Sequence, residues 1–558
     1  MIGVVSNPNQ SAVVKEFFEL FKTPWEFYCP AQVYDVVLVS ADQVPEVKAK
    51  LLIVCGAGTK SIDARIGTVA GERQHGAILS DENLTLPVFG CLQKLAKTND
   101  GTALVMTGTE IAGVKIKAGN CTVIRLGYDL FDEVQVLLTA GQPIENAHIP
   151  TLEIHIKMLR NWILGEGIPL LEIPPAPSGH SFTVCLTHDI DFVGIRNHKF
   201  DHTMWGFLYR STIGAIRKFL RGRLRLAHLF ATWRAAASLP FVYLGWLRDF
   251  WEPFAWYLAA EEGLPATYFL IPFKGRAGER VAGLHASRRA AAYDLNDISQ
   301  WIAPLKAAGC ELGVHGIDAW HSVEKGRAEL ARIKEISGEP NVGVRMHWLL
   351  QDANSVSVLE RSGYAYDSTV GYNETIGYRA GTSQVFRPFG AKKILELPLH
   401  IQDGAMFYPQ RLNLSEQEAA KRCHALIDNA NKFGGVLTII WHDRSHAPER
   451  FWGDFYVRLI QEIKSFGPWF TTASQAVGWF QKRRDVRFER LVGDTGVRAI
   501  SDSAGTEWAL PLNLRVYWPS EKSHGRPSSP PPVFKDLPWD GMNAFEFSPT
   551  SNPCLNCS

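Results

Sequence analysis

The sequence predicts an α/β protein in which a parallel (β/α) barrel follows a smaller α/β unit. Short apolar runs alternate with helical patterns along residues 1 to about 175, and the alternation returns from residue 181 to about 485. Three apolar runs of the second region end on carboxylate or imidazole side chains. Because α/β barrels carry their chemistry at the carboxyl ends of their strands, we expect the functional site in the second region.

The first region, residues 1–175, has the periodicity of a small α/β domain. Strands are expected at 36–39, 51–54, 104–106 and 122–126, and helices at 129–138 and 152–164. A proline-rich stretch at 173–179 follows, as is typical of a connection between domains. The sequence therefore places a domain boundary between residues 175 and 176, and it assigns the first domain no role.

The second region, residues 176–486, alternates strand and helix patterns as a parallel barrel requires. Its expected strands are 182–186, 266–271, 312–314, 342–345, 394–397, 436–441 and 469–471. Residues 487–558 lose this periodicity and are rich in proline, which predicts an irregular tail with one short β element at 512–518. The Cys554 and Cys557 pair in this tail is read as incidental, because no second pair or histidine accompanies it.

Residues 202–248, here called the basic insertion, interrupt the barrel pattern. They contain eight lysine or arginine residues and no acid, interleaved with aromatic and aliphatic residues. A basic amphipathic helix of this kind can lie in a membrane interface or hold lipid-linked phosphates. The alternative is a helical lid that packs on the barrel and keeps its arginines in water. The sequence leaves both interpretations open.

The overall composition excludes several classes of protein. The chain has 558 residues, of which 46% are apolar and 21% charged, as in soluble folded proteins. A net charge of +1 gives no global field that would attract nucleic acid. No apolar window reaches the ~18 residues that span a bilayer, and no secretory signal precedes the first strand. We therefore expect a cytoplasmic protein, with membrane association at the inner face through the basic insertion as the open alternative.

The polar side chains at the strand ends predict a hydrolytic metal site. Asp189 and Asp191 follow the run 182–186, His315 and His321 follow the run 312–314, and His442 ends the run 436–441. One carboxylate and two imidazoles can hold a divalent metal with positions open for water and substrate. A second carboxylate can then act as base and a further histidine as acid. The spacing thus predicts Asp189 as base, Asp191 and the two histidines as ligands, and His442 as acid.

At these residues the chain resembles the polysaccharide deacetylases of the NodB-homology superfamily, which form carbohydrate esterase family four. Segment 187–191 is similar to the first family motif, 344–348 to the third, 363–369 to the fourth and 437–442 to the last. The resemblance implies a distorted (β/α) barrel of the NodB-homology type and gives Arg345 the role of orienting the base. Segments 377–382 and 397–403 look like those of a bacterial subgroup with an extra N-terminal α/β domain.

One departure from the family pattern concerns the third metal ligand. The histidines of the family are usually four residues apart, whereas His315 and His321 are six apart and position 319 is alanine. Either a bulged loop delivers His321, or Asp318 supplies the ligand. Imidazole suits zinc, the expected metal, and this favours His321.

The resemblance and the residues together imply a metal-dependent hydrolase of non-peptide carbon–nitrogen bonds. It would remove N-acetyl or other N-acyl groups from amino sugars of a polysaccharide or its lipid-linked precursor, in bacterial cell-surface glycan biosynthesis. The expected partner is an N-acetylated glycan, with no nucleic acid. Residues expected to contact the sugar are Trp348, Tyr378, Arg379 and Asp367. Two alternatives remain, a non-catalytic glycan-binding or assembly protein and a hydrolase of cyclic amides on the same fold.

Overall fold

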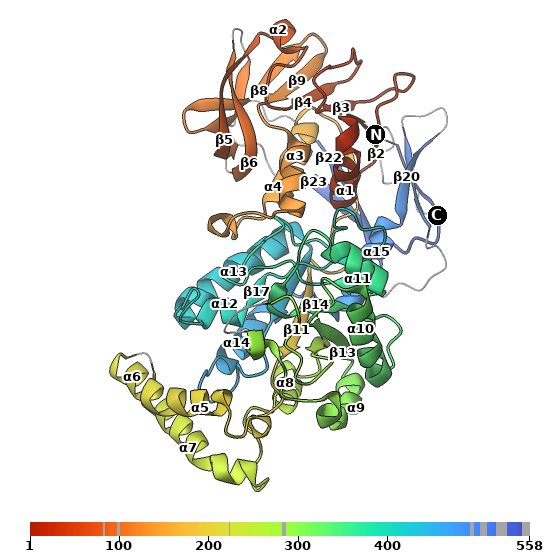
Figure 1. The fold of residues 1–558 in the computed structure, drawn as a ribbon. Helices are drawn as coiled ribbons and strands as arrows, with labels where there is room; N and C mark the ends of the chain where they lie inside the picture. The colour runs from red at the N-terminus through yellow and green to blue at the C-terminus, as the bar shows by residue number, and fades with distance from the viewer. Residues whose placement is uncertain are drawn as a thin grey trace.

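The computed structural model describes residues 1–81, 84–97, 101–222, 224–281, 286–491, 496–502, 510–519 and 533–548. Figure 1 shows an N-terminal sheet at the top, a second sheet surrounded by helices in the middle, and a helical projection at the bottom. Strands from the C-terminal part of the chain lie beside the N-terminal sheet. The protein is therefore of the mixed α/β class that the sequence predicts.

The N-terminal sheet has the strand order β2-β1-β3-β4-β9-β8-β6-β5-β7. Its first five strands pair in parallel, and the others pair antiparallel. Three of its strands coincide with predicted runs or extend them by one residue, and all their residues except Cys121 are buried. The strands are β1 (Ile2–Val5), β2 (Trp25–Phe27), β3 (Val36–Val39), β4 (Leu51–Cys55), β5 (Thr68–Asp81), β6 (Leu84–Lys97), β7 (Thr102–Thr107), β8 (Glu110–Ala118) and β9 (Cys121–Leu126).

Helices α1 (Ser11–Phe21), α2 (Asp63–Ile66), α3 (Leu130–Leu138) and α4 (Thr151–Gly165) accompany this sheet. Asp129 begins α3, because its carboxylate accepts hydrogen bonds from the backbone amides of Phe131 and Asp132. A core of buried aliphatic and aromatic side chains, among them Phe17 and Phe131, joins α1 and α3 to the sheet. The predicted helices at 129–138 and 152–164 therefore lie within a residue or two of α3 and α4.

The proline-rich connection at 173–178 is packed rather than free. Ile173 is completely buried, and Pro175 contacts Gly434 in the second half of the chain. Strand β10 (Leu170–Glu172), directly before it, pairs antiparallel with β22 (Leu512–Trp518). The connection is thus fixed on both sides by later parts of the chain.

The second sheet is parallel and follows the order β16-β15-β14-β13-β12-β11-β18-β17. It curls into a partial barrel, and within the described residues its edge strands β16 and β17 do not pair with each other. The strands are β11 (Thr183–Ile190), β12 (Ala266–Leu270), β13 (Glu311–Gly316), β14 (Val344–Met346), β15 (Tyr366–Asp367), β16 (Leu395–Glu396), β17 (Ile401–Gln402) and β18 (Val436–Ile440), and β19 (Trp469–Phe470) also pairs with β11.

Helices cover the outside of the second sheet (Figure 1). They are α8 (Phe254–Glu261), α9 (Ser299–Ala307), α10 (Val323–Ser337), α11 (Ser355–Ser362), α12 (Asp403–Phe407), α13 (Glu416–Phe433), α14 (Gly453–Lys464) and α15 (Ala473–Arg484). The outward strand residues, such as Leu186, Val314 and Ile439, form one core with these helices. All the predicted barrel runs contain a strand, and the two-residue strands β15 and β17 were not predicted because they are too short to show alternation.

The basic insertion is helical in its described part. It contains α5 (His202–Tyr209), a π-helical segment (Arg210–Gly214), α6 (Ala215–Leu220) and α7 (Leu226–Tyr243). Arg223 lies outside the described residues. These helices form the projection at the bottom of Figure 1. No helix in the described part of the chain is long and apolar enough to cross a membrane.

The C-terminal segment is more regular than the irregular tail that its prolines predict. Its described residues contain β20 (Val486–Arg490), β21 (Val497–Ser501), β22, β23 (Val533–Trp539) and β24 (Phe545–Phe547). These strands form two small antiparallel sheets, β20-β21-β24 and β10-β22-β23. The β element expected at 512–518 is β22, and buried Leu512, Leu514 and Val516 explain its stability. The Cys554 and Cys557 pair lies outside the described residues.

Candidate active site

The candidate active site lies at the carboxyl ends of four strands of the second sheet. Asp189 is in β11, His315 in β13 and Arg345 in β14, whereas His442 follows β18 by two residues. Side chains alternate between the two faces of a strand, so Thr187, Asp189 and Asp191 share one face. His188 points the other way, where its ring bonds to the Trp441 carbonyl oxygen and the Glu261 carboxylate. The alternation thus brings both carboxylates to the inside of the curled sheet.

Asp189 is held in place by Arg345, which is completely buried. Nη1 of Arg345 donates to Oδ1 of Asp189 at 2.9 Å and to the Thr187 hydroxyl at 2.7 Å. Ser368 accepts two further bonds from the guanidinium, which also lies 4.4 Å from the Phe269 ring centroid. Burial by itself would raise the pKa of Asp189, but the charge of Arg345 and, to a smaller extent, His315 and His442 lower it. Asp189 is therefore an ionised carboxylate with a fixed orientation.

A metal-ligand arrangement is formed by Asp191, His315 and His347. One potential ligand atom from each residue lies within 4.8 Å of the other two. Nε2 of His315 is 3.5 Å from Oδ1 of Asp191, and Nε2 of His347 is 3.4 Å from the same oxygen. Ligands about 2.0–2.1 Å from a tetrahedral zinc ion are about 3.3 Å apart. The three side chains are therefore spaced as a divalent cation between them would require.

The hydrogen bonds around these three side chains also fit a cation. Nδ1 of His315 donates to the Arg345 carbonyl oxygen at 3.1 Å, which leaves Nε2 free to be a ligand. Oδ1 of Asp191 is buried without a hydrogen-bond partner within the described structure. Burial lowers the pKa of His347 to about 3, so its ring is neutral. Two imidazoles and one carboxylate form a donor set that zinc accepts.

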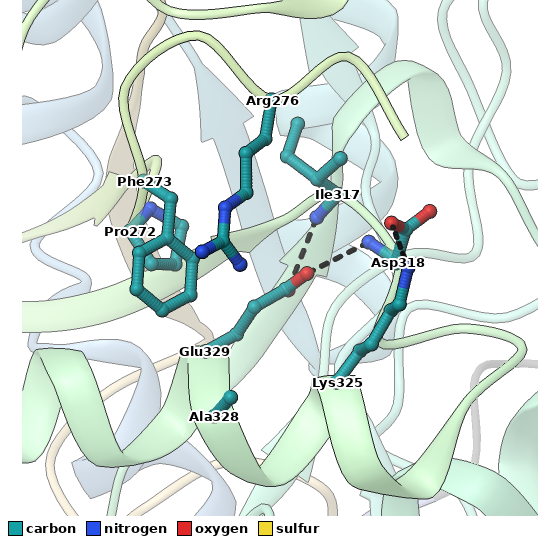
Figure 2. Close-up of a pocket in the computed structure, with 8 residues that line it drawn as sticks. All are labelled: Pro272, Phe273, Arg276, Ile317, Asp318, Lys325, Ala328 and Glu329. Atoms are coloured by element: carbon teal, nitrogen blue, oxygen red, sulfur yellow. Dashed lines mark hydrogen bonds and ion pairs between the residues drawn. The ribbon is translucent and has the colours of Figure 1, made fainter. Parts of the chain in front are cut away.

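The structure places His321 and Asp318, the two third ligands expected from the sequence, outside this arrangement and brings His347 into it. His321 Nε2 bonds Oδ1 of Asp318 at 3.0 Å. That carboxylate also accepts bonds from the Glu279 backbone amide and from Lys325. Both residues follow β13 in a turn that the carboxylate of Glu329 on α10 holds through two backbone amides, as Figure 2 shows. Asp318 also lines a small pocket beside α10 (Figure 2).

His347 could have been found from the alternation of strand residues. It follows β14 directly and stands two positions after Arg345, so both side chains point to the inside of the sheet. β14 also lies next to β13, with His315 opposite Arg345 in the register. The alternation along β14 therefore indicates His347 as a candidate ligand, whereas the usual histidine spacing of the family favours position 321.

His442 forms a close pair with Asp403, which the sequence left without a role. Nδ1 of His442 lies 2.5 Å from Oδ1 of Asp403, and the His442 backbone amide donates to Oδ2 at 2.8 Å. Burial by itself would lower the pKa of His442, but Asp403 raises it to about 10, aided by the charges of Asp189 and Asp191. Asp403 directly follows β17, the neighbour of β18. His442 is thus a protonated imidazole at neutral pH.

Of the residues expected to contact the sugar, Trp348 alone lies next to this cluster. It follows His347, its ring centroid is 5.6 Å from that of His347, and 39% of the residue is exposed. Its backbone has φ 64°, in the left-handed region that is uncommon for a large side chain and is concentrated at functional sites. The loop after β14 therefore presents an aromatic face beside the metal-ligand arrangement.

The other three expected sugar contacts lie elsewhere. Tyr378 is buried, and its backbone amide donates to the Ala147 carbonyl oxygen of the first region. Arg379 contacts the same region through a bond from the Gln142 amide to its carbonyl oxygen. Asp367 is buried behind Ser368, where it accepts a hydrogen bond from Thr369. These positions connect parts of the chain or support Arg345, and they do not line the cluster.

Comparison with known proteins finds similar chains among solved structures only. No family model and no curated protein matches the chain. Among solved structures, a putative polysaccharide deacetylase from Mycobacterium smegmatis has 17% identity and a TM-score of 0.33, covering 56% of this chain and 95% of its own. A probable polysaccharide deacetylase from Pseudomonas aeruginosa PAO1 has 14% identity and a TM-score of 0.33, covering 54% and 92%.

A third structure, Agd3, described as a novel carbohydrate deacetylase, has 8% identity and a TM-score of 0.38. It covers 99% of this chain and 98% of its own. The sequence identities and TM-scores are low, so the reaction has to be inferred from the side chains of this chain and not from these structures. These three solved structures are described as polysaccharide or carbohydrate deacetylases.

Proposed function

We propose that this protein is a metal-dependent hydrolase that removes N-acetyl or other N-acyl groups from amino sugars of a polysaccharide or of its lipid-linked precursor. One observation carries the proposal. A carboxylate oriented by an arginine and an imidazole oriented by a carboxylate both lie at the strand ends that supply a three-residue metal-ligand arrangement. Hydrolysis of an amide needs these three parts, namely a base, an acid and a site that stabilises negative charge.

Asp191, His315 and His347 would hold the cation, and zinc suits one carboxylate and two imidazoles. A divalent cation bound there would polarise the acyl carbonyl group and lower the pKa of water. Asp191 and His442 each keep part of the side chain exposed, 23% and 19% respectively, whereas His315 is buried. The open part of the site therefore lies between Asp191 and His442, where a substrate can enter.

Asp189 would act as the general base. Its carboxylate is ionised and one of its oxygens, Oδ1, is already bonded to Arg345. Oδ2 lies 3.9 Å from Nε2 of His315 and is the oxygen available to take a proton from an attacking water. Arg345 would keep the carboxylate in this orientation through its bonds to Thr187 and Ser368.

His442 would act as the general acid. Departure of an amino-sugar nitrogen as a poor leaving group requires a proton, and the imidazole carries one because Asp403 raises its pKa. The same carboxylate fixes which ring nitrogen faces the site, since Nδ1 is bonded to Asp403 and Nε2 is left for the substrate. Trp348 would stack on a sugar ring beside His347.

Release of acetate from a panel of N-acetylated oligosaccharides by zinc-loaded protein tests the proposal. The parent should release acetate, and Asp189→Asn should retain zinc but lose about 10²–10⁴-fold in turnover, as expected for a general base. Asp428→Asn, at an exposed position in α13, is the matched control and should keep full activity. Full activity in Asp189→Asn would rule out the role of this carboxylate.

The six-residue spacing of His315 and His321 favours the non-catalytic alternative, because it departs from the ligand spacing of the family. A donor set of Asp191, His315 and His347 does not need His321, so the spacing no longer favours a protein without metal. Binding of the oligosaccharides without zinc and without acetate release would restore this alternative. Turnover of a cyclic amide in place of an acetylated sugar would favour the other alternative.

A further inference from the structure

The basic insertion leaves the barrel at the candidate active site. The chain reaches it from β11 and Asp191 through residues 192–201 and continues from it to α8. Connections that follow parallel strands lie at the carboxyl edge of the sheet, where the catalytic side chains are found. The helices α5, α6 and α7 project from this edge, away from the N-terminal sheet (Figure 1).

The inner face of the insertion is fixed to the loop that follows His442. Leu239 and Val242 of α7 pack with Ala447 in one small core. The Thr232 hydroxyl donates to the Pro448 carbonyl oxygen at 2.9 Å, and the His228 ring stacks on Phe451 at 4.1 Å between centroids. The insertion is thus a packed part of the catalytic edge.

The outer face of α7 is apolar as well. Leu226, Phe230, Trp233, Phe241 and Leu244 are all exposed, and their spacing of 4, 7, 15 and 18 residues from Leu226 places them on one side of the helix. The side toward the barrel carries Leu229, Ala235, Leu239 and Val242, which are buried. A surface helix normally turns a polar face to water, so an outer face of this composition is suited to burial against something else.

Exposed apolar residues are concentrated in the insertion. In the described part of the chain, 23 large hydrophobic residues are exposed, and 13 of them lie within 202–248. They include Trp205, Trp246 and Leu220, of which 58%, 72% and 77% are exposed. Single exposed apolar residues need no explanation, but a patch of this density marks an interaction site.

The charge of the same surface is entirely positive. Seven basic residues of the insertion are described and all are exposed: Arg210, Arg217, Lys218, Arg221, Arg225, Arg234 and Arg248. No acid occurs between Asp201 and Asp249. The occupant of this surface must therefore offer negative charge beside an apolar region.

We propose that the basic insertion docks on the surface of a bilayer that contains anionic phospholipids. Its tryptophans and aliphatic side chains would enter the boundary between headgroups and acyl chains, and its arginines and Lys218 would contact the phosphates. A second copy of the chain suits the surface poorly, because a symmetric contact sets the same positive patches against each other.

Docking in this way would set the catalytic edge close to the bilayer. The loop 443–451, to which the insertion is fixed, continues from His442. A sugar attached to a lipid in the same bilayer would then reach the site without diffusing away. Docking itself does not require the proposed hydrolase activity, so binding and activity can be tested separately.

Flotation with vesicles tests the docking. Zinc-loaded full-length protein is mixed either with phosphatidylcholine vesicles or with vesicles of phosphatidylcholine and phosphatidylglycerol, and the bound fraction is measured at low and high salt. We expect binding to the anionic vesicles alone, weakened by salt as exposed charges are screened.

Two sets of variants separate the contributions of the basic and the tryptophan side chains to vesicle binding. Arg217→Gln, Lys218→Gln and Arg221→Gln together should weaken binding about 100-fold, as expected for three cations at an anionic surface. Trp205→Ser with Trp246→Ser should weaken binding at all salt concentrations. The matched control, Val69→Ser with Ile78→Ser, changes exposed apolar residues of β5 in the N-terminal sheet and should bind as the parent does.

Three results would overturn the proposal. They are the absence of flotation with anionic vesicles, equal flotation of the parent and the arginine variants, and a dimer of the parent that the tryptophan variants dissociate. Circular dichroism and acetate release from a water-soluble oligosaccharide show whether each variant is folded. If the oligosaccharide is not cleaved by any protein, flotation still decides the docking, because it needs no substrate.

Discussion

Single side chains at the strand ends decide which chemistry this barrel can perform. Asp189 and His442 have pKa values shifted in opposite directions, which leaves Asp189 ionised and His442 protonated at the same pH. Each shift has a nearby cause, the Arg345 guanidinium for the first and the Asp403 carboxylate for the second. Removing the partner of each residue is therefore as informative as removing the residue itself.

The identity of the third ligand gives the first residue-scale prediction. His347→Ala should lose stoichiometric zinc and most turnover, because two donors remain in place of three. His321→Ala should keep its zinc, since this ring bonds Asp318. Metal analysis of the purified variants by mass spectrometry checks both. Normal zinc content in His347→Ala together with loss of zinc in His321→Ala would mean that His321, and not His347, is the third ligand.

The pair of His442 and Asp403 gives the second residue-scale prediction. A raised pKa keeps the imidazole protonated as pH rises, so activity that needs the acid is lost only when pH approaches that value. Asp403→Asn removes the charge that raises the pKa of His442 to about 10. The high-pH limb of kcat/KM should then move to lower pH, and kcat should fall about 10²–10⁴-fold.

A pH profile of the Asp403→Asn variant over pH 5 to about 10 measures this shift. Asp403→Glu restores the charge and should return the limb toward its original position. A fall in kcat with an unmoved limb would mean that Asp403 supports the fold of this edge and does not tune His442.

At the scale of elements, the position of β14 decides the site, because this short strand carries Arg345 and precedes His347. β14 can pair with β15 because residue 343 is a glycine. A Cβ atom at this position would lie 2.0 Å from Cζ of Tyr366 in β15. The Tyr366 hydroxyl bonds to the buried Glu311 carboxylate, so its ring cannot move aside easily. The absence of a side chain at 343 thus sets the distance between Arg345 and Asp189.

Gly343→Ala should therefore destabilise the protein by about 1–3 kcal/mol and reduce its zinc content. Chemical denaturation and metal analysis measure the two effects. Gly478→Ala is the matched control in α15, where no atom lies within 4 Å of the added carbon. It should be neutral or stabilise the helix by up to about 1 kcal/mol. Equal behaviour of the two variants would contradict the steric argument.

At the scale of the whole molecule, the last barrel helix connects the second sheet to the N-terminal one. Arg483 of α15 is buried and donates to the carbonyl oxygens of Glu19 and Leu20 at the end of α1. Arg484 forms a two-pronged ion pair with Glu16 at 2.8 and 2.7 Å. The pairing of β10 with β22 adds a second connection. These contacts should make the two sheets unfold together.

Glu16→Ala tests this connection, because it leaves the Arg484 guanidinium buried without its partner. Such a loss costs about 3–5 kcal/mol, and it should separate an early unfolding step of the N-terminal sheet from that of the barrel. Glu546→Ala removes the exposed pair with Arg498 and should cost less than about 1 kcal/mol. Denaturation followed by fluorescence and circular dichroism compares them. A single unchanged transition in Glu16→Ala would contradict the coupling.

Local patterns in the sequence determined the main barrel strands and the polar side chains at their ends. Buried strands such as β3 and β18 were predictable because apolar runs report burial directly. Asp189, Asp191, His315 and His442 were predictable because they end such runs. Helix α7 is apolar on both faces, so its composition alone could not separate a packed lid from a docking surface.

Only the tertiary structure decided which side chains meet. His347 and Asp403 join the site because β14 lies beside β13 and β17 beside β18, and strand neighbours are set by pairing across the sheet. Strand β22 pairs with β10, which lies more than 300 residues earlier in the chain. Propensity and alternation act over a few neighbouring residues, so the sequence by itself determined the main strands of the barrel. Long-range pairing and packing decided the C-terminal strands, the meeting of His347 with Asp191 and His315, the pair of His442 and Asp403, and the exposed basic surface.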